Sequence, residues 1–288
     1  MKLSVNVGSF ALEGYGFKRH VELASKLGFQ AVELWIDRKN LWPLKLKKPL
    51  RQRALQVIKS YGLTVTSLCP IPFSAKKWEE FGFEFNLADQ DPGRRRMAVK
   101  FYNSALDLAS NLGAKAIIVL PGKMEEPNLM KSKASFRNYF ERAVESLKDC
   151  GRHAEGVGVC LGVENAVVGN FIDRPEEMAS IVDEVSSEYV KAYLDISNAN
   201  VFFPPTRYIE TLRGRLLDCI HVSDNDGTYA WHLPIGMGKI DYRGVIQKLK
   251  EIHWDGYLVP EIFYSKDPVK GVRDSKVKLE GLIKELGV

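Results

Sequence analysis

The sequence predicts an α/β protein built as a single-domain (β/α)8 TIM barrel over residues 1–288. Short apolar runs rich in β-branched residues alternate with longer amphipathic runs, and this alternation repeats eight times. No linker, low-complexity segment or shift in composition divides the chain. The alternation indicates parallel strands joined by helices, and eight such units are the number that closes this type of barrel.

The predicted strands are runs of six or seven mostly apolar residues, such as KAIIVL and KAYLDI. β-branched and aromatic residues favour the extended conformation, and these runs are rich in them. The eight runs cover residues 3–8, 30–35, 64–69, 115–120, 158–164, 191–196, 217–222 and 257–262.

The predicted helices lie between these strands and show apolar residues at helical spacing. Three of them have clear starts: Asp91 precedes Pro92, Arg174 precedes Pro175, and Asp241 suits a helix N-terminus. The eight helices cover residues 17–27, 50–61, 93–111, 132–155, 175–185, 205–213, 241–252 and 269–286.

A doubly wound open sheet is the rival architecture. Such a sheet often carries a GxGxxG turn after its first strand, and the corresponding segment here, GSFALEGYGF, lacks that pattern. One connection, residues 70–91, is unusually long and rich in aromatic residues. Long loops are often lids over an active site, and packing on a helix or on a neighbouring subunit is the alternative.

The composition predicts a cytoplasmic protein without a membrane partner. No apolar run reaches about 18 residues, the length needed to span a bilayer. The N-terminus MKLSVNVGSF lacks the features of a signal peptide. Four cysteines without a CxxC motif fit a reducing compartment. A net charge of +5 is mild for 288 residues, so we expect no nucleic-acid partner.

Four successive predicted strands finish with a residue that can bind a metal. These residues are Glu164, Asp195, His221 and Glu261. Because the carboxyl ends of the strands meet at one face of the barrel, we expect the four side chains to converge there. Three carboxylates buried together would repel one another unless a cation lies among them. The sequence therefore predicts a metal site at this face.

The chemistry of the four ligands predicts a single divalent ion. Three carboxylates and one imidazole favour Mn²⁺, with Mg²⁺, Co²⁺ and Zn²⁺ as alternatives. No thiolate belongs to the set, so we do not expect a structural zinc site. His221 would bind as a neutral imidazole, oriented by a neighbouring hydrogen-bond acceptor.

The order of these residues resembles the xylose isomerase-like barrel superfamily. The matching segments are VEN from residue 163, LDISN from 194, HVSDNDG from 221, HLPIGMGKID from 232 and PEI from 260. The superfamily contains sugar isomerases, ketose 3-epimerases, hydroxypyruvate isomerases, inosose dehydratases and endonuclease IV. The resemblance covers essentially the whole chain and implies a metal-dependent enzyme.

The resemblance implies a sugar isomerase or epimerase that acts on a ketose or a related polyol ketone through a cis-enediolate. A divalent metal would bind the carbonyl and adjacent hydroxyl oxygens of the substrate. Glu164 and Glu261 would remove and return the proton as base and acid. The expected partner is thus a small sugar or polyol, and members of such families often form homo-oligomers.

Departures from the family patterns bear on the alternatives. Asn198 and Ala230 stand where endonuclease IV-like members place zinc ligands, which makes a phosphodiesterase less expected. Asn198 and Gly227 also replace the His and Arg that ketose 3-epimerases usually have, so no particular sugar is implied. An inosose dehydratase-like lyase needs the same ligands and stays an alternative. A barrel without catalysis is opposed by the intact pair Glu164 and Glu261.

Four further residues are candidates for contacts with the substrate. His232 lies beyond a turn after the seventh strand, and its role is substrate binding, structural support or direct metal ligation. Glu33 ends the second strand, and Asn198 follows Asp195 by three positions. Lys123 follows the fourth strand and suits an anionic group on the substrate.

Overall fold

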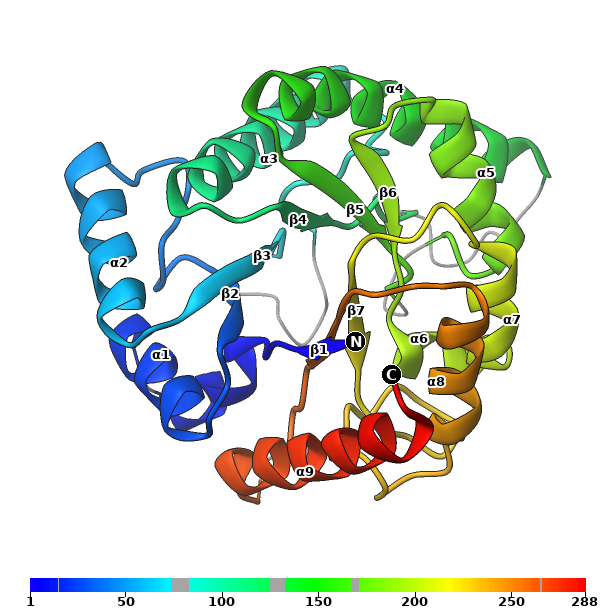
Figure 1. The fold of residues 1–288 in the computed structure, drawn as a ribbon. Helices are drawn as coiled ribbons and strands as arrows, with labels where there is room; N and C mark the ends of the chain where they lie inside the picture. Colours follow the sequence, from blue (N-terminus) through cyan, green and yellow to red (C-terminus); the bar gives the residue numbers. More distant parts are fainter. Residues whose placement is uncertain (15, 74–82, 125–132, 167–170, 265) are drawn as a thin grey trace.

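The structure is a computed structural model that describes residues 1–14, 16–73, 83–124, 133–166, 171–264 and 266–288. Short parallel strands surround a central axis, and helices cover their outer side (Figure 1). The strands are β1 Lys2–Leu3, β2 Ala31–Ile36, β3 Thr64–Pro70, β4 Ala116–Val119, β5 Cys160–Glu164, β6 Val190–Tyr193, β7 Cys219–Val222 and β8 Tyr257–Pro260.

The strands form one closed ring. Regular pairing gives two sheets, with the orders β1-β8-β7 and β2-β3-β4-β5-β6. Isolated bridges join the two sheets at both seams: Asn6 pairs with Glu33, and Asp195 pairs with His221. At the second seam the His221 N–H donates to the Leu194 carbonyl at 3.0 Å. The predicted (β/α)8 barrel is therefore confirmed.

The helices occupy the predicted intervals, with ends shifted by at most a few residues. They are α1 Phe17–Lys26, α2 Lys48–Ser60, α3 Pro92–Leu112, α4 Lys133–Val157, α5 Pro175–Val185, α6 Ile196–Phe202, α7 Pro205–Thr211, α8 Tyr242–Glu251 and α9 Pro268–Leu286, with a 3-10 helix, η1, at Val7–Glu13. Among the described residues no helix is long and apolar enough to cross a membrane.

Two short helices were not predicted, and both shorten a predicted strand. The first strand gives way to η1, where the Asn6 side chain accepts a hydrogen bond from Gly8 N–H at 2.7 Å. The sixth strand ends at Tyr193, because Asp195 caps α6 by accepting from Asn198 N–H at 2.7 Å. Polar side chains that satisfy free N–H groups thus end both strands early.

Alternate strand residues fill the interior of the barrel, while the residues between them pack outward against the helices. The interior cluster contains Cys69, Ile71, Ala116, Ile118, Tyr193, Leu217, Cys219 and Val259. His221 and Asp195 come two positions after Cys219 and Tyr193, so they point to the same side. The polar site therefore continues directly from the apolar interior of the barrel.

The long connection after β3 packs partly on the outside of the barrel. The ring of Phe85 stacks on Phe101 of α3, with centroids 4.3 Å apart. Phe73 and Phe83 contact each other edge to face at 4.9 Å. Residues 74–82 of the predicted lid lie outside the described residues. In the described part, Phe85 packs on a helix while Phe73 lines a cavity at the carboxyl ends of the strands, so the lid interpretation stays a prediction.

Two glycines should respond to alanine with opposite signs. A Cβ at Gly162 in β5 would lie 2.9 Å from two carbons of Tyr193, whose hydroxyl is held by Glu33. Gly162→Ala should lower the free energy of unfolding by about 2 kcal/mol, because the interior has no room to repack. Gly281→Ala on α9, with no atom within 4 Å, should raise it by about 0.5 kcal/mol. Chemical denaturation measures both, and effects of equal sign would contradict this account of the interior.

Candidate active site

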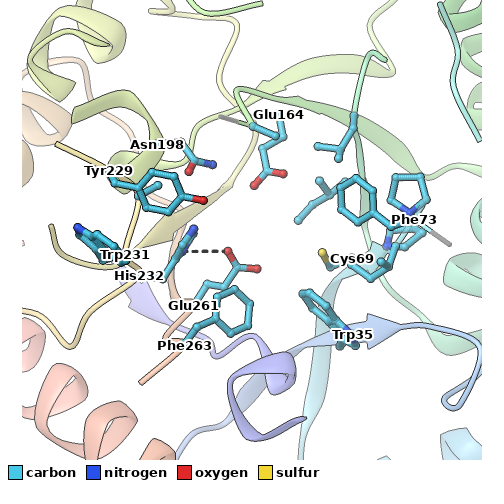
Figure 2. Close-up of a pocket in the computed structure, with 17 residues that line it drawn as sticks. Trp35, Cys69, Phe73, Glu164, Asn198, Tyr229, Trp231, His232, Glu261 and Phe263 are labelled. Carbon is cyan, nitrogen blue, oxygen red and sulfur yellow. Dashed lines mark ion pairs between the residues drawn. The ribbon is translucent and has the colours of Figure 1, made fainter. Parts of the chain in front are cut away.

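A cavity of about 250 Å³ opens at the carboxyl ends of the strands. Figure 2 shows the carboxylates of Glu164 and Glu261 pointing into it from different walls. The other lining residues are mostly apolar or aromatic: Trp35, Cys69, Pro70, Ile71, Pro72, Phe73, Ile118, Leu120, Ala166, Asn198, Tyr229, Ala230, Trp231, His232 and Phe263. An apolar cavity with a few convergent polar groups is the usual form of a small-molecule site.

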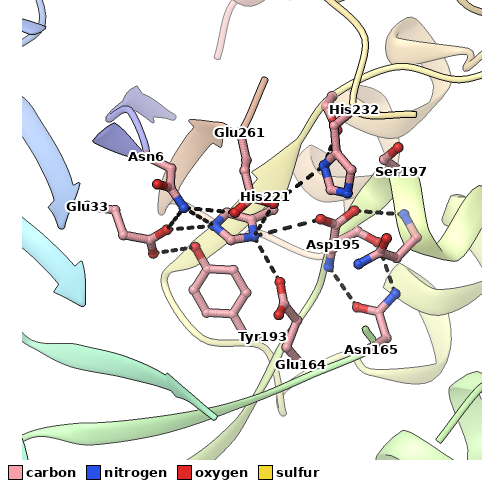
Figure 3. A network of polar contacts seen from close by, with 12 residues as sticks. Asn6, Glu33, Glu164, Asn165, Tyr193, Asp195, Ser197, His221, His232 and Glu261 are labelled. Carbon is pink, nitrogen blue, oxygen red and sulfur yellow. Dashed lines mark hydrogen bonds and ion pairs between the residues drawn. The ribbon is translucent and has the colours of Figure 1, made fainter. Parts of the chain in front are cut away.

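His221 lies beneath this cavity, between two carboxylates (Figure 3). Its Nε2 is 2.6 Å from Glu33 Oε1, and its Nδ1 is 2.8 Å from Glu164 Oε1. Nδ1 also faces Asp195 Oδ2 at 3.7 Å and Glu261 Oε2 at 3.5 Å. The imidazole therefore has one nitrogen anchored to Glu33 and the other directed at the three carboxylates predicted as metal ligands.

Glu33, a predicted contact of the substrate, lies on β2 beneath the cavity. Its side chain is fully buried below the cavity and does not line it. It accepts hydrogen bonds from Asn6 Nδ2 at 2.9 Å, Ser67 Oγ at 2.6 Å and the Tyr193 hydroxyl at 2.8 Å. These donors hold the Glu33 carboxylate in place, and Glu33 in turn orients His221. This position beneath the cavity suits a role in orienting His221, and a contact of Glu33 with the substrate stays a prediction.

Asp195 is fixed by its backbone while one of its oxygens has no hydrogen bond. Its N–H donates to Asn165 Oδ1 at 2.7 Å, and its carbonyl accepts from Asn165 Nδ2 at 3.0 Å. Oδ1 caps α6, but Oδ2 is buried and has no hydrogen-bond partner among the residues that the structure describes. A buried carboxylate oxygen without a partner is costly. Its position beside His221 and Glu164 fits a cation.

The ligand atoms come together in two overlapping groups. Glu164, Asp195 and His221 each offer an atom within 4.8 Å of the others, and so do Asp195, His232 and Glu261. Asp195 belongs to both groups, so all four predicted ligands gather around its carboxylate. The donor set is oxygen-rich with imidazole nitrogen, which suits a divalent cation.

The electrostatics of the site also favour a positive charge among these groups. Burial lowers the pKa of His221, but the charges of Glu261 and Glu33 outweigh it and raise this pKa well above its ordinary value. Burial and the neighbouring carboxylates raise the pKa of Glu261 well above the usual range. Burial likewise raises the pKa of the Cys69 thiol, which favours its protonated form.

The other predicted substrate contacts divide into two groups. His232 and Asn198 line the cavity, and His232 Nδ1 lies 3.1 Å from Ser223 Oγ and 3.4 Å from Glu261 Oε2. Lys123 is not among the described residues that line the cavity, and its backbone is held by Asn86. The role of Lys123 stays a prediction.

Sequence reasoning missed the residues that complete the polar network and the cavity wall. Asn6 donates to Glu33 at 2.9 Å and to Glu261 at 2.8 Å, linking the first and last strands. Its place at the end of the first predicted strand could have identified it. Tyr229 and Trp231 lie on a loop that has no periodic pattern, so no such signal marked them.

Comparison with known proteins agrees with this geometry. The family model described as xylose isomerase-like TIM barrel matches residues 21–280. An uncharacterized protein of Methanocaldococcus jannaschii is 30% identical over 203 residues, covering 68% of this chain and 67% of that protein. Fructoselysine 3-epimerase of Escherichia coli O157:H7 is 22% identical over 269 residues, covering 91% and 92%.

A solved structure shows the same fold over the full length of both chains. A D-tagatose 3-epimerase-like protein superimposes with a TM-score of 0.81 at 23% identity, covering 99% of this chain and 100% of that one. The family model and this superposition agree with the closed ring of strands described above. The chain belongs to the xylose isomerase-like TIM barrel family.

Proposed function

We propose that this protein is a divalent-metal-dependent sugar isomerase or epimerase, acting on a ketose or a related polyol ketone. The observation that carries the proposal is the convergence of Glu164 and Glu261 on one cavity, with Asp195 and His221 directly behind them. Relatives named as sugar epimerases support the class of reaction. Mn²⁺ is the favoured ion because the donors are mainly carboxylate oxygens.

The residues of the chain suit proton transfer at carbon. A divalent ion held by Glu164, Asp195, His221 and Glu261 would stabilise negative charge on the carbonyl oxygen of the substrate. Glu164 comes from β5 and Glu261 follows β8, so the two carboxylates approach the cavity from separate walls. One removes a proton from the carbon next to the carbonyl, and the other returns a proton to the opposite face or to the neighbouring carbon.

The remaining walls serve to position the substrate and exclude water. Asn198 and His232 offer polar groups for sugar hydroxyls from the same side of the cavity (Figure 2). Trp35 and Phe263, in edge contact at 5.8 Å, form an apolar wall. A water-poor cavity strengthens the electrostatic effect of each charged group near the reacting carbon.

The test is turnover of a panel of ketoses by Mn²⁺-loaded protein in D₂O, followed by NMR and mass spectrometry. We expect an isomeric product that carries deuterium at the reacting carbon. A product lighter by one water would indicate the dehydratase alternative, and nicking of abasic DNA would indicate a phosphodiesterase. Glu164→Gln should lower kcat at least about 100-fold, because it removes a proton-transfer group. The variant Glu22→Gln on α1, where Glu22 pairs with Arg19 and Lys26, serves as the control and should match the unaltered protein in kcat.

Metal content gives a separate prediction. Protein purified without added metal should hold about one divalent ion per chain, since the ligand atoms form one connected cluster. Asp195→Asn should lose most of this ion, because Asp195 belongs to both groups of ligand atoms. Elemental analysis measures the content. Two or three zinc ions per chain, or equal loading of Asp195→Asn, would refute the single-ion site.

Glu33 provides a test of the positioning contact beneath the site. Glu33→Gln keeps the size of the side chain but removes the charge that anchors His221 Nε2. We expect metal affinity to fall about 10-fold or more, as is usual when a partner of a ligand histidine is altered. Competition with a fluorescent chelator measures the affinity. Unchanged affinity beside a matched Glu22→Gln control would show that the Glu33 contact does not orient His221.

A further inference from the structure

Two aromatic side chains on the rim of the cavity are exposed to solvent. The side chains of Tyr229 and Trp231 are 41% and 54% exposed, and their ring centroids lie 4.9 Å apart. The described residues include a few other exposed large hydrophobic side chains, such as Phe202 and Met237, but only Tyr229 and Trp231 line the cavity. An exposed apolar patch that continues a binding cavity is a mark of ligand binding.

The loop that carries these rings is firmly held at its base. Asp224 and Leu233 exchange two backbone hydrogen bonds, of 2.8 and 2.9 Å. The Asp224 carboxylate also accepts from the N–H groups of Asn225, Gly236 and Ile240 at 2.9, 2.7 and 3.2 Å. The rings are therefore displayed on a closed loop, and little ordering is needed when a ligand binds.

The loop is also tied to the helix that begins at the metal site. Asn225 Nδ2 donates to the carbonyl and the hydroxyl of Ser197 in α6, at 2.7 and 2.8 Å. Asn225 Oδ1 accepts from Asn200 at 2.8 Å and from Gly227 N–H at 2.9 Å. Since Asp195 caps α6, the aromatic pair has a defined position relative to the reacting centre.

The chemistry of the rim favours an uncharged ring. Within the described part of the chain, no Lys or Arg lines the cavity, and its acidic groups are the predicted ligands Glu164 and Glu261. Tyr and Trp offer flat apolar faces with a polar edge, which suit the C–H face of a sugar ring. The wall formed by Tyr229 and Trp231 lies on the rim, outside the carboxylates of Glu164 and Glu261. It is therefore suited to bind a part of the substrate that does not react.

We propose that the substrate is an uncharged carbonyl sugar linked to a second sugar ring, and that this second ring packs on Tyr229 and Trp231. The inference rests on the proposed function, because it assigns the reacting ring to the cavity between Glu164 and Glu261. Binding of the remote ring supplies energy that positions the reacting ring, so it raises kcat/KM for the linked sugar over the free one.

The kinetic test compares D-fructose with maltulose and isomaltulose, two disaccharides whose fructose unit keeps its carbonyl and O3 free. With Mn²⁺-loaded protein, kcat/KM for at least one disaccharide should exceed that for fructose about tenfold. Trp231→Ala and Tyr229→Ala should each lower this ratio severalfold, as expected from the loss of one stacked ring. Met237→Ala, 53% exposed and not lining the cavity, is the matched control and should leave the ratio unchanged.

A binding test separates this inference from the proposed reaction. Maltitol and sorbitol have no carbonyl group and cannot react, and they differ by one glucose ring. Calorimetry should show that maltitol binds the holoprotein about tenfold more tightly than sorbitol, and that Trp231→Ala removes most of the difference. This result, without turnover of any ketose, would support the second-ring site and reject the proposed reaction.

Two outcomes would overturn the inference. In the first, fructose is turned over as well as the disaccharides and the variants leave the ratio unchanged, so the proposed function stands without a second-ring site. In the second, sedimentation shows that Trp231→Ala converts a dimer to a monomer while maltitol and sorbitol bind alike. The aromatic pair would then be a contact between two copies of the chain.

Discussion

The rest of the site depends on two contacts of the His221 imidazole. Its nitrogens lie 2.6 Å from Glu33 and 2.8 Å from Glu164. Such a contact is strong in a dry interior, and leaving either carboxylate unpaired there would be costly. Glu33 belongs to the bridge with Asn6 and His221 to the bridge with Asp195, which close the barrel at its two seams. The residues that close the ring of strands therefore also build the polar network. The donors around Glu33, from β3 and β6 as well as Asn6, extend this coupling across the barrel.

Much of the fold and the ligand set could be predicted from the sequence, because parallel strands bring their carboxyl ends to one face. Strand parity then places Glu164, Asp195, His221 and Glu261 together. The parity of a residue does not predict how deep in the barrel its side chain lies, because that depth depends on how the strands are staggered. Glu33 and Trp35 share a parity, yet Trp35 lines the cavity and Glu33 lies one layer below. The register of β2 against β3 also shifts next to Glu33, and no local sequence pattern predicts this shift. The helix α6 was missed because seven residues are too few to show a helical period.

The predicted ligands and the walls of the cavity come from different kinds of structural element. The predicted ligands come from strand ends or from the residues directly after them, where backbone pairing restricts each side chain. The walls come largely from loops, such as the segment that ends at Phe73 and the segment that carries Tyr229 and Trp231. Relatives named for different sugars match the same barrel, among them fructoselysine 3-epimerase and D-psicose 3-epimerase. Chemistry common to a family and preference for one sugar can thus reside in separate parts of the chain.

The loop after β7 has a base that is held by hydrogen bonds and a tip that carries exposed rings. These two parts should tolerate substitution to different degrees. Asp224 and Asn225 satisfy backbone groups of the loop and of α6, so their loss would disturb Asp195 as well. Tyr229 and Trp231 are exposed on the rim of the cavity, whereas His232 on the same loop lies 3.4 Å from Glu261. Substitutions of the two exposed rings should therefore disturb the predicted metal ligands less than a substitution of His232. The loop thus separates a base tied to α6 from an exposed rim, so the shape of the cavity entrance can change while the backbone contacts beside Asp195 stay the same.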